Sequence, residues 1–146
     1  MEIGKYWDTI RALFQQAFQS SLHYAIATTN EDGSPHVTPV GALILREDCT
    51  GFFFEEFLSV MTRNLERNNR VSVLAVNSDI TFWRKAIFDG TFETPPAVRL
   101  TGTVGKKREA TTDEIAAWHT CIEFARGTKG FDLLWKKHAY GQRYLL

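Results

Sequence analysis

Apolar residues at helical spacing open the chain. Between Ile3 and Phe18 they recur at steps of three and four residues, which is typical of an amphipathic helix. We therefore predict a helix over residues 3–18, lying across one end of the protein body.

The next two segments have the composition of paired strands. Leu22–Thr29 and His36–Leu45 flank a turn that contains an Asp-Gly step, so they predict a β-hairpin. Pro39 lies inside the second strand and cannot donate to a ladder, so we expect this strand to be irregular or unpaired on one side there. Such an opening would let a planar ligand reach backbone groups. A barrel-edge bulge without a ligand is the alternative.

A strand, a short helix and a second strand follow between residues 51 and 76. Phe52–Phe54 is a compact apolar run, Ser59–Asn68 carries apolar residues at helical spacing, and Val71–Val76 alternates. The start of the helix bears Ser59, Thr62 and Arg63. Free backbone N–H groups and the helix dipole favour an anion at such a place, so this start is a candidate phosphate site.

The remainder predicts two more helices and one more strand. Asp79 is a plausible cap for a helix through Phe88, and Val98–Val104 alternates like a strand. The basic run over 105–108 is typical of a solvated strand end, with a phosphate-facing role as the alternative. A capping-box pattern opens a helix over 111–124, and a helical or irregular tail follows it.

Composition limits the function classes. A chain of 146 residues with 44% hydrophobic content fits one domain over 1–146. Its 17 basic and 17 acidic residues cancel, so no nucleic-acid partner is expected. No apolar run approaches the roughly 18 residues of a membrane span, and no signal-peptide pattern opens the chain. We expect a cytoplasmic protein without a membrane partner.

Motifs for several common chemistries do not occur. The four histidines lack metal-ligand spacing, so no metal site is expected, and Cys49 and Cys121 are expected to be free thiols. The G-x-S-x-G, G-x-G-x-x-G and P-loop patterns of hydrolases and nucleotide-binding proteins are absent from the sequence.

Two segments carry a family resemblance. Residues 59–73, SVMTRNLERNNRVSV, resemble the "S-x-K-x-x-N-L-x-x-N-P-R-V-S" segment of the pyridoxamine 5′-phosphate oxidase-like family of FMN-binding split barrels. Residues 36–43, HVTPVGAL, resemble the second strand of that family. The resemblance covers about residues 20 to 105. It implies a mainly β fold with flanking helices, built on a six-stranded antiparallel split β-barrel.

The resemblance also implies where FMN would bind. In the family the second strand lies along the flavin ring and the helix start holds the phosphate, while the strand before the helix passes the ribityl chain. The corresponding cofactor-binding residues here are Pro39, Val40, Gly41, Ala42, Glu55, Ser59, Met61, Thr62 and Arg63. We add Trp83, because Phe82 and Trp83 are adjacent on a helix and only one of them can face inward.

Two departures from the family pattern change the expected activity. Met61 stands where the family usually has a phosphate-binding lysine, which leaves Arg63 as the local cation. The resemblance thus implies that a lysine at position 61 would strengthen FMN binding. The C-terminal Arg-x-Leu-x-Pro segment of the true oxidases has no match, so oxidation of pyridoxamine phosphate is not expected.

The function that follows is that of an FMN-dependent oxidoreductase acting on an unknown small-molecule redox substrate. Hydride exchange through flavin N5 needs no side-chain acid or base, so no catalytic residue is expected. Within the same family, F420 and haem are alternative cofactors. A non-enzymatic binding module for storage or sensing is the alternative from another class.

We also expect a homodimer with two cofactor sites at its interface. A six-stranded barrel is filled by its own side chains, so a flavin must lie outside it and needs further walls. A second copy would supply those walls. It would also cover four aromatic residues that look exposed in the sequence, which are Phe82, Trp83, Trp118 and Trp135.

Overall fold

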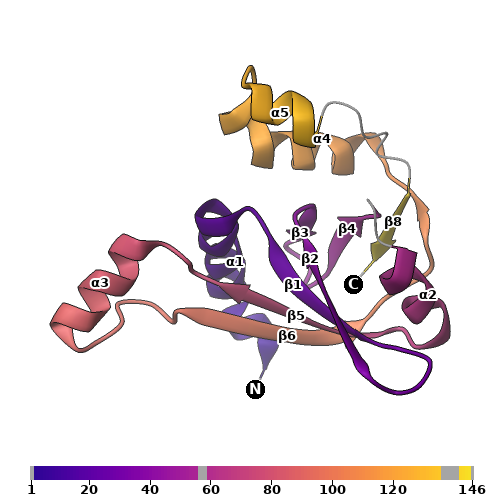
Figure 1. Ribbon diagram of the computed structural model, residues 1–146, viewed down its shortest axis with the longest axis horizontal. Coiled ribbons are helices and arrows are strands. Elements are labelled where there is room, and N and C mark those ends of the chain that lie inside the picture. Colours follow the sequence, from indigo (N-terminus) through magenta and orange to yellow (C-terminus); the bar gives the residue numbers. More distant parts are fainter. Residues whose placement is uncertain (1, 56–58, 136–141, 146) are drawn as a thin grey trace.

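Two four-stranded antiparallel sheets form the body of the protein. The computed structural model describes residues 2–55, 59–135 and 142–145. The strand orders are β2-β1-β5-β6 and β3-β4-β8-β7 (Figure 1). The strands are β1 (Tyr24–Thr29), β2 (Pro35–Val40), β3 (Leu43–Leu45), β4 (Gly51–Phe54), β5 (Arg70–Val76), β6 (Ala97–Thr103), β7 (Arg108–Glu109) and β8 (Gln142–Leu145).

The helices lie around these sheets. They are α1 (Trp7–Ser21), α2 (Ser59–Arg67), α3 (Ile80–Asp89), α4 (Thr112–Ile122) and α5 (Lys129–Leu134), with short 3₁₀ turns η1 (Ile3–Tyr6) and η2 (Glu123–Ala125). Each predicted helix is therefore present, and the first one runs on to Ser21, where Leu22 takes a left-handed conformation and ends it.

The chain passes from one sheet to the other at both edges. β2 continues into β3 through Gly41–Ala42, and β6 leads into β7 through residues 104–107. If each of these pairs is counted as one bent strand, the described residues contain six strands. The sheets do not close into a continuous barrel, and the fold is the expected split barrel. β8, which pairs with β4 and β7, is a strand that the sequence pattern does not predict.

The predicted hairpin is confirmed, but its second strand is interrupted. Pro39 pairs with Ala25 in the antiparallel register of β1 and β2, and β2 is an edge strand, the position in a sheet where proline is tolerated. The strand predicted over 36–45 breaks at Gly41. A Cβ added there would lie 3.1 Å from the carbonyl oxygen of Leu22, so the chain passes too close to α1 for a larger residue to fit without movement.

The hydrophobic core lies between the sheets and under α1. One face of α1 is buried, as the helical spacing predicts, and β4 is buried along its whole length. On β1 the inward residues Tyr24, Ile26 and Thr28 alternate with half-buried ones. The core therefore covers the inner faces of both sheets.

Helix α3 stands apart from this core. It is carried by the extended β5–β6 hairpin and projects beyond the sheets at one end of the molecule (Figure 1). The Asp79 side chain caps it as predicted, accepting a hydrogen bond of 2.7 Å from Thr81 N. No residue of α3 is buried, and Ile87 and Phe88 are 76% and 87% exposed.

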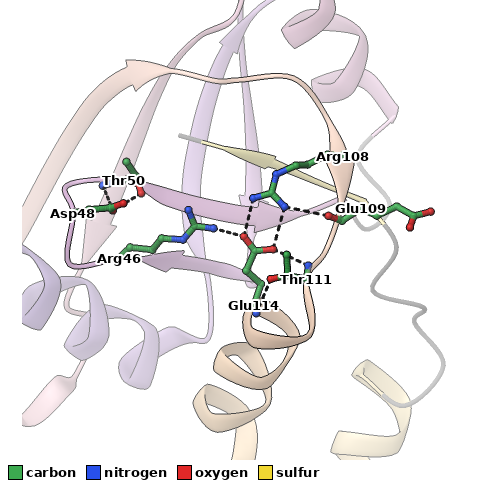
Figure 2. A network of polar contacts seen from close by, with 7 residues as sticks. All are labelled: Arg46, Asp48, Thr50, Arg108, Glu109, Thr111 and Glu114. Carbon is green, nitrogen blue, oxygen red and sulfur yellow. Dashed lines mark hydrogen bonds and ion pairs between the residues drawn. The ribbon is translucent and has the colours of Figure 1, made fainter.

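The position of α4 is fixed by one buried carboxylate. Glu114 accepts hydrogen bonds from Arg108, at 3.0 Å, and from Arg46, and it completes a capping box with Thr111 (Figure 2). Arg46 directly follows β3 and Arg108 begins β7, so this carboxylate joins α4 to two strands of the second sheet.

Four aromatic side chains, those of Phe82, Trp83, Trp118 and Trp135, are expected to be exposed. For Trp118 this expectation is wrong. Its side chain is 1% exposed and packs on Phe18, Phe54 and Trp135. α4 buries Trp118 together with Ile122 on its core-facing side, so this tryptophan belongs to the hydrophobic core and not to the surface.

Candidate functional site

The bend between β2 and β3 lies beside the start of α2. Phe54, the last residue of β4, donates its backbone N–H to Ala42 O at 3.1 Å. Glu55 follows Phe54, and its carboxylate accepts a hydrogen bond of 2.6 Å from the Thr62 hydroxyl in the first turn of α2. Gly41, Ala42, Glu55 and Thr62 are therefore brought together. We call the group formed by residues 39–42, Glu55 and the first turn of α2 the β2–α2 site.

A salt bridge sets the charge at this site. Glu55 forms an ion pair with Lys107, which lies between β6 and β7. Burial alone would raise the pKa of Glu55, but the hydrogen bonds from Lys107 and Thr62 outweigh it and hold this pKa below its ordinary value. The carboxylate is therefore ionised at neutral pH. Lys107 is not among the site residues expected from the sequence, although it lies in the basic run over 105–108.

Backbone groups, more than side chains, face outward along the bend. Val40 and Ala42 are buried with 4% and 5% exposure, so their side chains belong to the core, whereas Pro39 is exposed. No strand of the described residues pairs with the outer edge of β2. A planar ligand at this edge would meet backbone N–H and C=O groups together with the ring of Pro39.

Two residues of the predicted phosphate site point away from each other. Met61 is 1% exposed and lies in the hydrophobic core, so only its backbone could face a ligand. A lysine there would lose most of its hydration, and the stronger FMN binding expected from the sequence does not follow from this placement. Arg63 is exposed and lines an open hollow of about 630 Å³ beside the β1–β2 turn.

Trp83 is not part of the β2–α2 site within one chain. It lies on α3, which projects from the end of the molecule opposite α2 (Figure 1). Its indole N–H donates to Asn77 O at 2.6 Å, and its ring packs edge-on against Phe82 and Phe92. Both adjacent aromatics, Phe82 and Trp83, are half-buried in this local cluster.

The residues of the β2–α2 site fit most parts of an FMN molecule. The open edge of β2 suits the flavin ring, the Glu55 carboxylate suits a ribityl hydroxyl donor, and the start of α2 at Ser59 suits the phosphate. The fit is weakest at the phosphate, because the negatively charged carboxylate of Glu55 lies close to the same helix turn. The ammonium group of Lys107 is already paired with this carboxylate.

Neither a metal site nor a membrane span is found in the part of the chain that the structure describes. Within residues 2–55, 59–135 and 142–145 no group of three or more histidine, cysteine, aspartate or glutamate side chains could hold a metal ion. No helix in these ranges is both long enough and apolar enough to cross a bilayer. Cys49 and Cys121 are free thiols, as expected.

The comparison with protein families identifies the chain. Residues 10–142 match the family described as pyridoxamine 5′-phosphate oxidase, and the chain belongs to this family. A search among curated proteins finds no significant sequence match.

Several solved structures have the same fold. HupZ from Group A Streptococcus aligns with 95% of this chain and 86% of its own, at a TM-score of 0.56 and 15% identity. An FMN-binding protein from Syntrophomonas wolfei aligns with 97% of this chain and 86% of its own, at a TM-score of 0.58 and 10% identity. A heme binding protein from Mycobacterium smegmatis aligns with 92% of this chain and 50% of its own, at a TM-score of 0.51 and 17% identity. At such identities the likeness concerns the fold alone.

Proposed function

We propose that the chain is an FMN-binding flavoprotein that acts as an oxidoreductase on a small molecule. The observation that carries this proposal is that hydrogen bonds hold the β2–β3 bend, Glu55 and the first turn of α2 next to one another. These bonds run from Phe54 N to Ala42 O and from the Thr62 hydroxyl to Glu55. It places an open strand edge beside a helix start, which is the pair of features that a planar ligand with a phosphate requires. The FMN-binding neighbour from Syntrophomonas wolfei supports the same choice of cofactor.

The proposed roles follow from this geometry. Pro39 and the backbone of residues 40–42 lie along the flavin ring, and Glu55 accepts a hydrogen bond from the ribityl chain. The N–H groups at the start of α2 bind the phosphate, including those of Ser59, Met61 and Thr62, with Arg63 as a nearby cation. When bound, FMN supplies hydride transfer, and the side chains place it and exclude water.

A homodimer is part of the proposal. In one chain Trp83 lies on α3, far from the β2–α2 site, so it can approach a cofactor only from a second copy (Figure 1). α3 and the following loop also expose Ile80, Ile87, Phe88 and Phe92 to solvent. A two-fold contact that buries this face would cover it and add a wall to the cofactor site.

The absorption spectrum of the purified protein is the first test. Flavin bands that remain after gel filtration would support FMN, and titration of the flavin-free protein with FMN would give its affinity. Turnover of NAD(P)H with an artificial electron acceptor would then separate a reductase from a binding module. Protein that neither carries nor takes up FMN at micromolar concentration would overturn the proposal.

Haem is the second candidate, because the fold is shared with a heme binding protein from Mycobacterium smegmatis. A Soret band would favour it over FMN. F420 would be recognised by its own absorption and by turnover with reduced F420 but not with NAD(P)H.

A further inference from the structure

A hollow of about 420 Å³ lies between α1, α4 and β3. This volume is within the range of small-molecule sites in proteins. Its floor is apolar and is formed mainly by Phe14, Phe18, Tyr24, Leu43 and Trp118, and its rim is polar, with Asp8, Arg11, Gln15 and Cys121. None of the residues of the β2–α2 site lines it, so the hollow is separate from the proposed FMN site.

Trp118 in the floor has an unsatisfied hydrogen-bond donor. The residue is 1% exposed, and its indole Nε1 is the one buried side-chain polar atom without a partner among the described residues. By contrast, the indole N–H groups of Trp7 and Trp83 donate to the carbonyl oxygens of Arg46 and Asn77. An unpaired buried donor costs about 1 to 3 kcal/mol, so an acceptor that reaches Trp118 would be favoured.

The cation on the rim has room for an anionic partner. Arg11 is a third exposed, and its nearest carboxylate oxygens are 3.6 Å away on Asp8 and 3.9 Å away on Glu47. Both distances exceed that of a hydrogen bond, and both acidic side chains are almost fully exposed, so these ion pairs are weak. Several N–H groups of the guanidinium therefore remain available for a bidentate contact with a carboxylate.

The walls of the hollow are held in place without a ligand. Glu114 fixes α4 to Arg46 and Arg108 (Figure 2). Tyr24 donates its hydroxyl to Phe14 O at 2.9 Å, which ties β1 to α1. A site with fixed walls binds with less loss of conformational entropy than one that must form around its ligand.

We propose that this hollow binds a small carboxylic acid with an apolar body, either aromatic or aliphatic. The apolar body lies on the floor formed by Phe14, Phe18 and Leu43. The carboxylate lies between Arg11 and Trp118, so that one of its oxygens contacts the guanidinium and the other accepts the hydrogen bond from Trp118 Nε1. The opposing charge of Asp8 limits the affinity, so we expect binding at micromolar to millimolar concentration.

Nuclear magnetic resonance of the indole N–H groups tests this directly. Benzoate and decanoate serve as the probes, added to the full chain labelled with ¹⁵N. We expect the assigned Trp118 indole signal to move and to saturate with one of these acids, while the Trp7 and Trp83 signals stay in place because their donors are already bonded. A Trp118 signal that does not move with either acid up to millimolar concentration would overturn the proposal.

Variants on the exposed part of the hollow separate specific from general binding. Ala12→Phe places a ring in the hollow and should abolish the shift, whereas the control Ala116→Phe, on α4 outside the lining, should leave it unchanged. Arg11→Gln should weaken benzoate at least threefold and leave benzyl alcohol unaffected. Shifts that persist in Ala12→Phe would contradict the site. An equal affinity of Arg11→Gln for benzoate would contradict the carboxylate.

Alkylation of the two free thiols provides a readout without any substitution. Cys121 lines the hollow, whereas Cys49 does not, and both thiols are exposed. A saturating acid should slow the reaction of Cys121 with iodoacetamide and leave that of Cys49 unchanged. Equal rates for Cys121 with and without the acid would count against occupation of the hollow.

Discussion

The side-chain amide of Asn64 on α2 donates a hydrogen bond of 3.1 Å to the hydroxyl of Thr28 on β1, although 36 residues separate them in the chain. The same amide donates to Asn30 Oδ1 at 2.9 Å. Asn64 is buried, so these bonds replace those that water would make. They hold α2 against the first sheet and thereby keep the start of α2 close to the β2–β3 bend.

Replacement of Asn64 by alanine should destabilise the protein. The change leaves the Thr28 hydroxyl and the Asn30 carbonyl without their donor, which costs about 1 to 3 kcal/mol in the free energy of unfolding. Urea denaturation followed by circular dichroism would measure it. Glu66→Ala, at an exposed position of the same helix, is the control and should change stability by less than about 0.5 kcal/mol. Equal stability of both variants would mean that Asn64 does not anchor α2.

Glu114 should make the stability dependent on pH. Burial alone would raise its pKa, but the hydrogen bonds from Thr111 and Arg108 and the charge of Arg108 hold this pKa below its ordinary value of 4.5. The stabilisation is therefore complete above the pKa of the unfolded chain and is lost as the pH falls through the lower pKa of the folded state.

Glu114→Gln tests this effect. At neutral pH the variant should be less stable than the wild type by about 1.5 to 3 kcal/mol, the range for hydrogen bonds to charged groups. The difference should shrink as the pH falls from the ordinary pKa of 4.5, which applies to the unfolded chain, through the lower pKa of the folded carboxylate. Urea unfolding between pH 3 and about 7 would follow it, with the exposed Glu123→Gln as the control. A difference that stays constant with pH would contradict the assignment.

Met61→Lys should destabilise the fold. The lysine ammonium would replace a side chain with 1% exposure in the core, at a cost of about 2 to 4 kcal/mol. Met61→Leu keeps the volume and should cost less than about 1.5 kcal/mol. Urea denaturation gives the stability of both variants, and an FMN titration gives the affinity of each. A lysine variant that is as stable as the wild type and binds FMN more tightly would show that position 61 reaches the phosphate.

Arg63→Glu should weaken FMN binding if the phosphate lies at the start of α2. Reversal of one exposed charge near an anion costs about 1 kcal/mol, or roughly fivefold in affinity at low salt. Quenching of flavin fluorescence would give the affinity of each variant. Arg126→Glu, after α4, changes the net charge equally and should have no effect. An unchanged affinity of Arg63→Glu would place the phosphate elsewhere.

Phe88→Asp should dissociate the proposed homodimer. Phe88 is 87% exposed on α3, so the change should leave the monomer fold intact while it places a charge in the proposed contact. Light scattering should then give a mass near 16.7 kDa for the variant and twice this value for the wild type. Phe124→Asp, at 65% exposure on η2, is the control and should remain dimeric. A wild-type mass near 16.7 kDa would refute the dimer.

Hydrophobic spacing predicts much of the secondary structure here because elements that pack on the core, such as α1 and β1, have one clearly buried face. The spacing in α1 and the alternation in β1 are repeated in the burial pattern of the structure. The break at Gly41 is different, since it depends on the approach of Leu22 from another part of the chain. A local pattern contains no such information.

The candidate site is only partly predictable for the same reason. The resemblance locates the β2–β3 bend and the start of α2, but the pairing of Glu55 with Lys107 joins residues 52 positions apart, and no local spacing indicates it. For Met61 the helical spacing of apolar residues over 59–68 indicates a buried position, whereas the resemblance places position 61 at the phosphate. The structure agrees with the spacing. Trp118 looks like a surface residue until the partners of α4 are known.

The base of the projecting hairpin is closed by a hydrogen bond of 2.8 Å from Asn77 N to Pro96 O. Everything beyond this bond, including α3, contributes no buried side chain to the barrel. The segment from Ser78 to Pro95 is therefore a replaceable module. An engineer could exchange it for a tight turn, or for a peptide tag or sensor domain, and keep the β5–β6 ladder in register. Variation of this segment among related chains would change what the protein associates with while its barrel stayed the same.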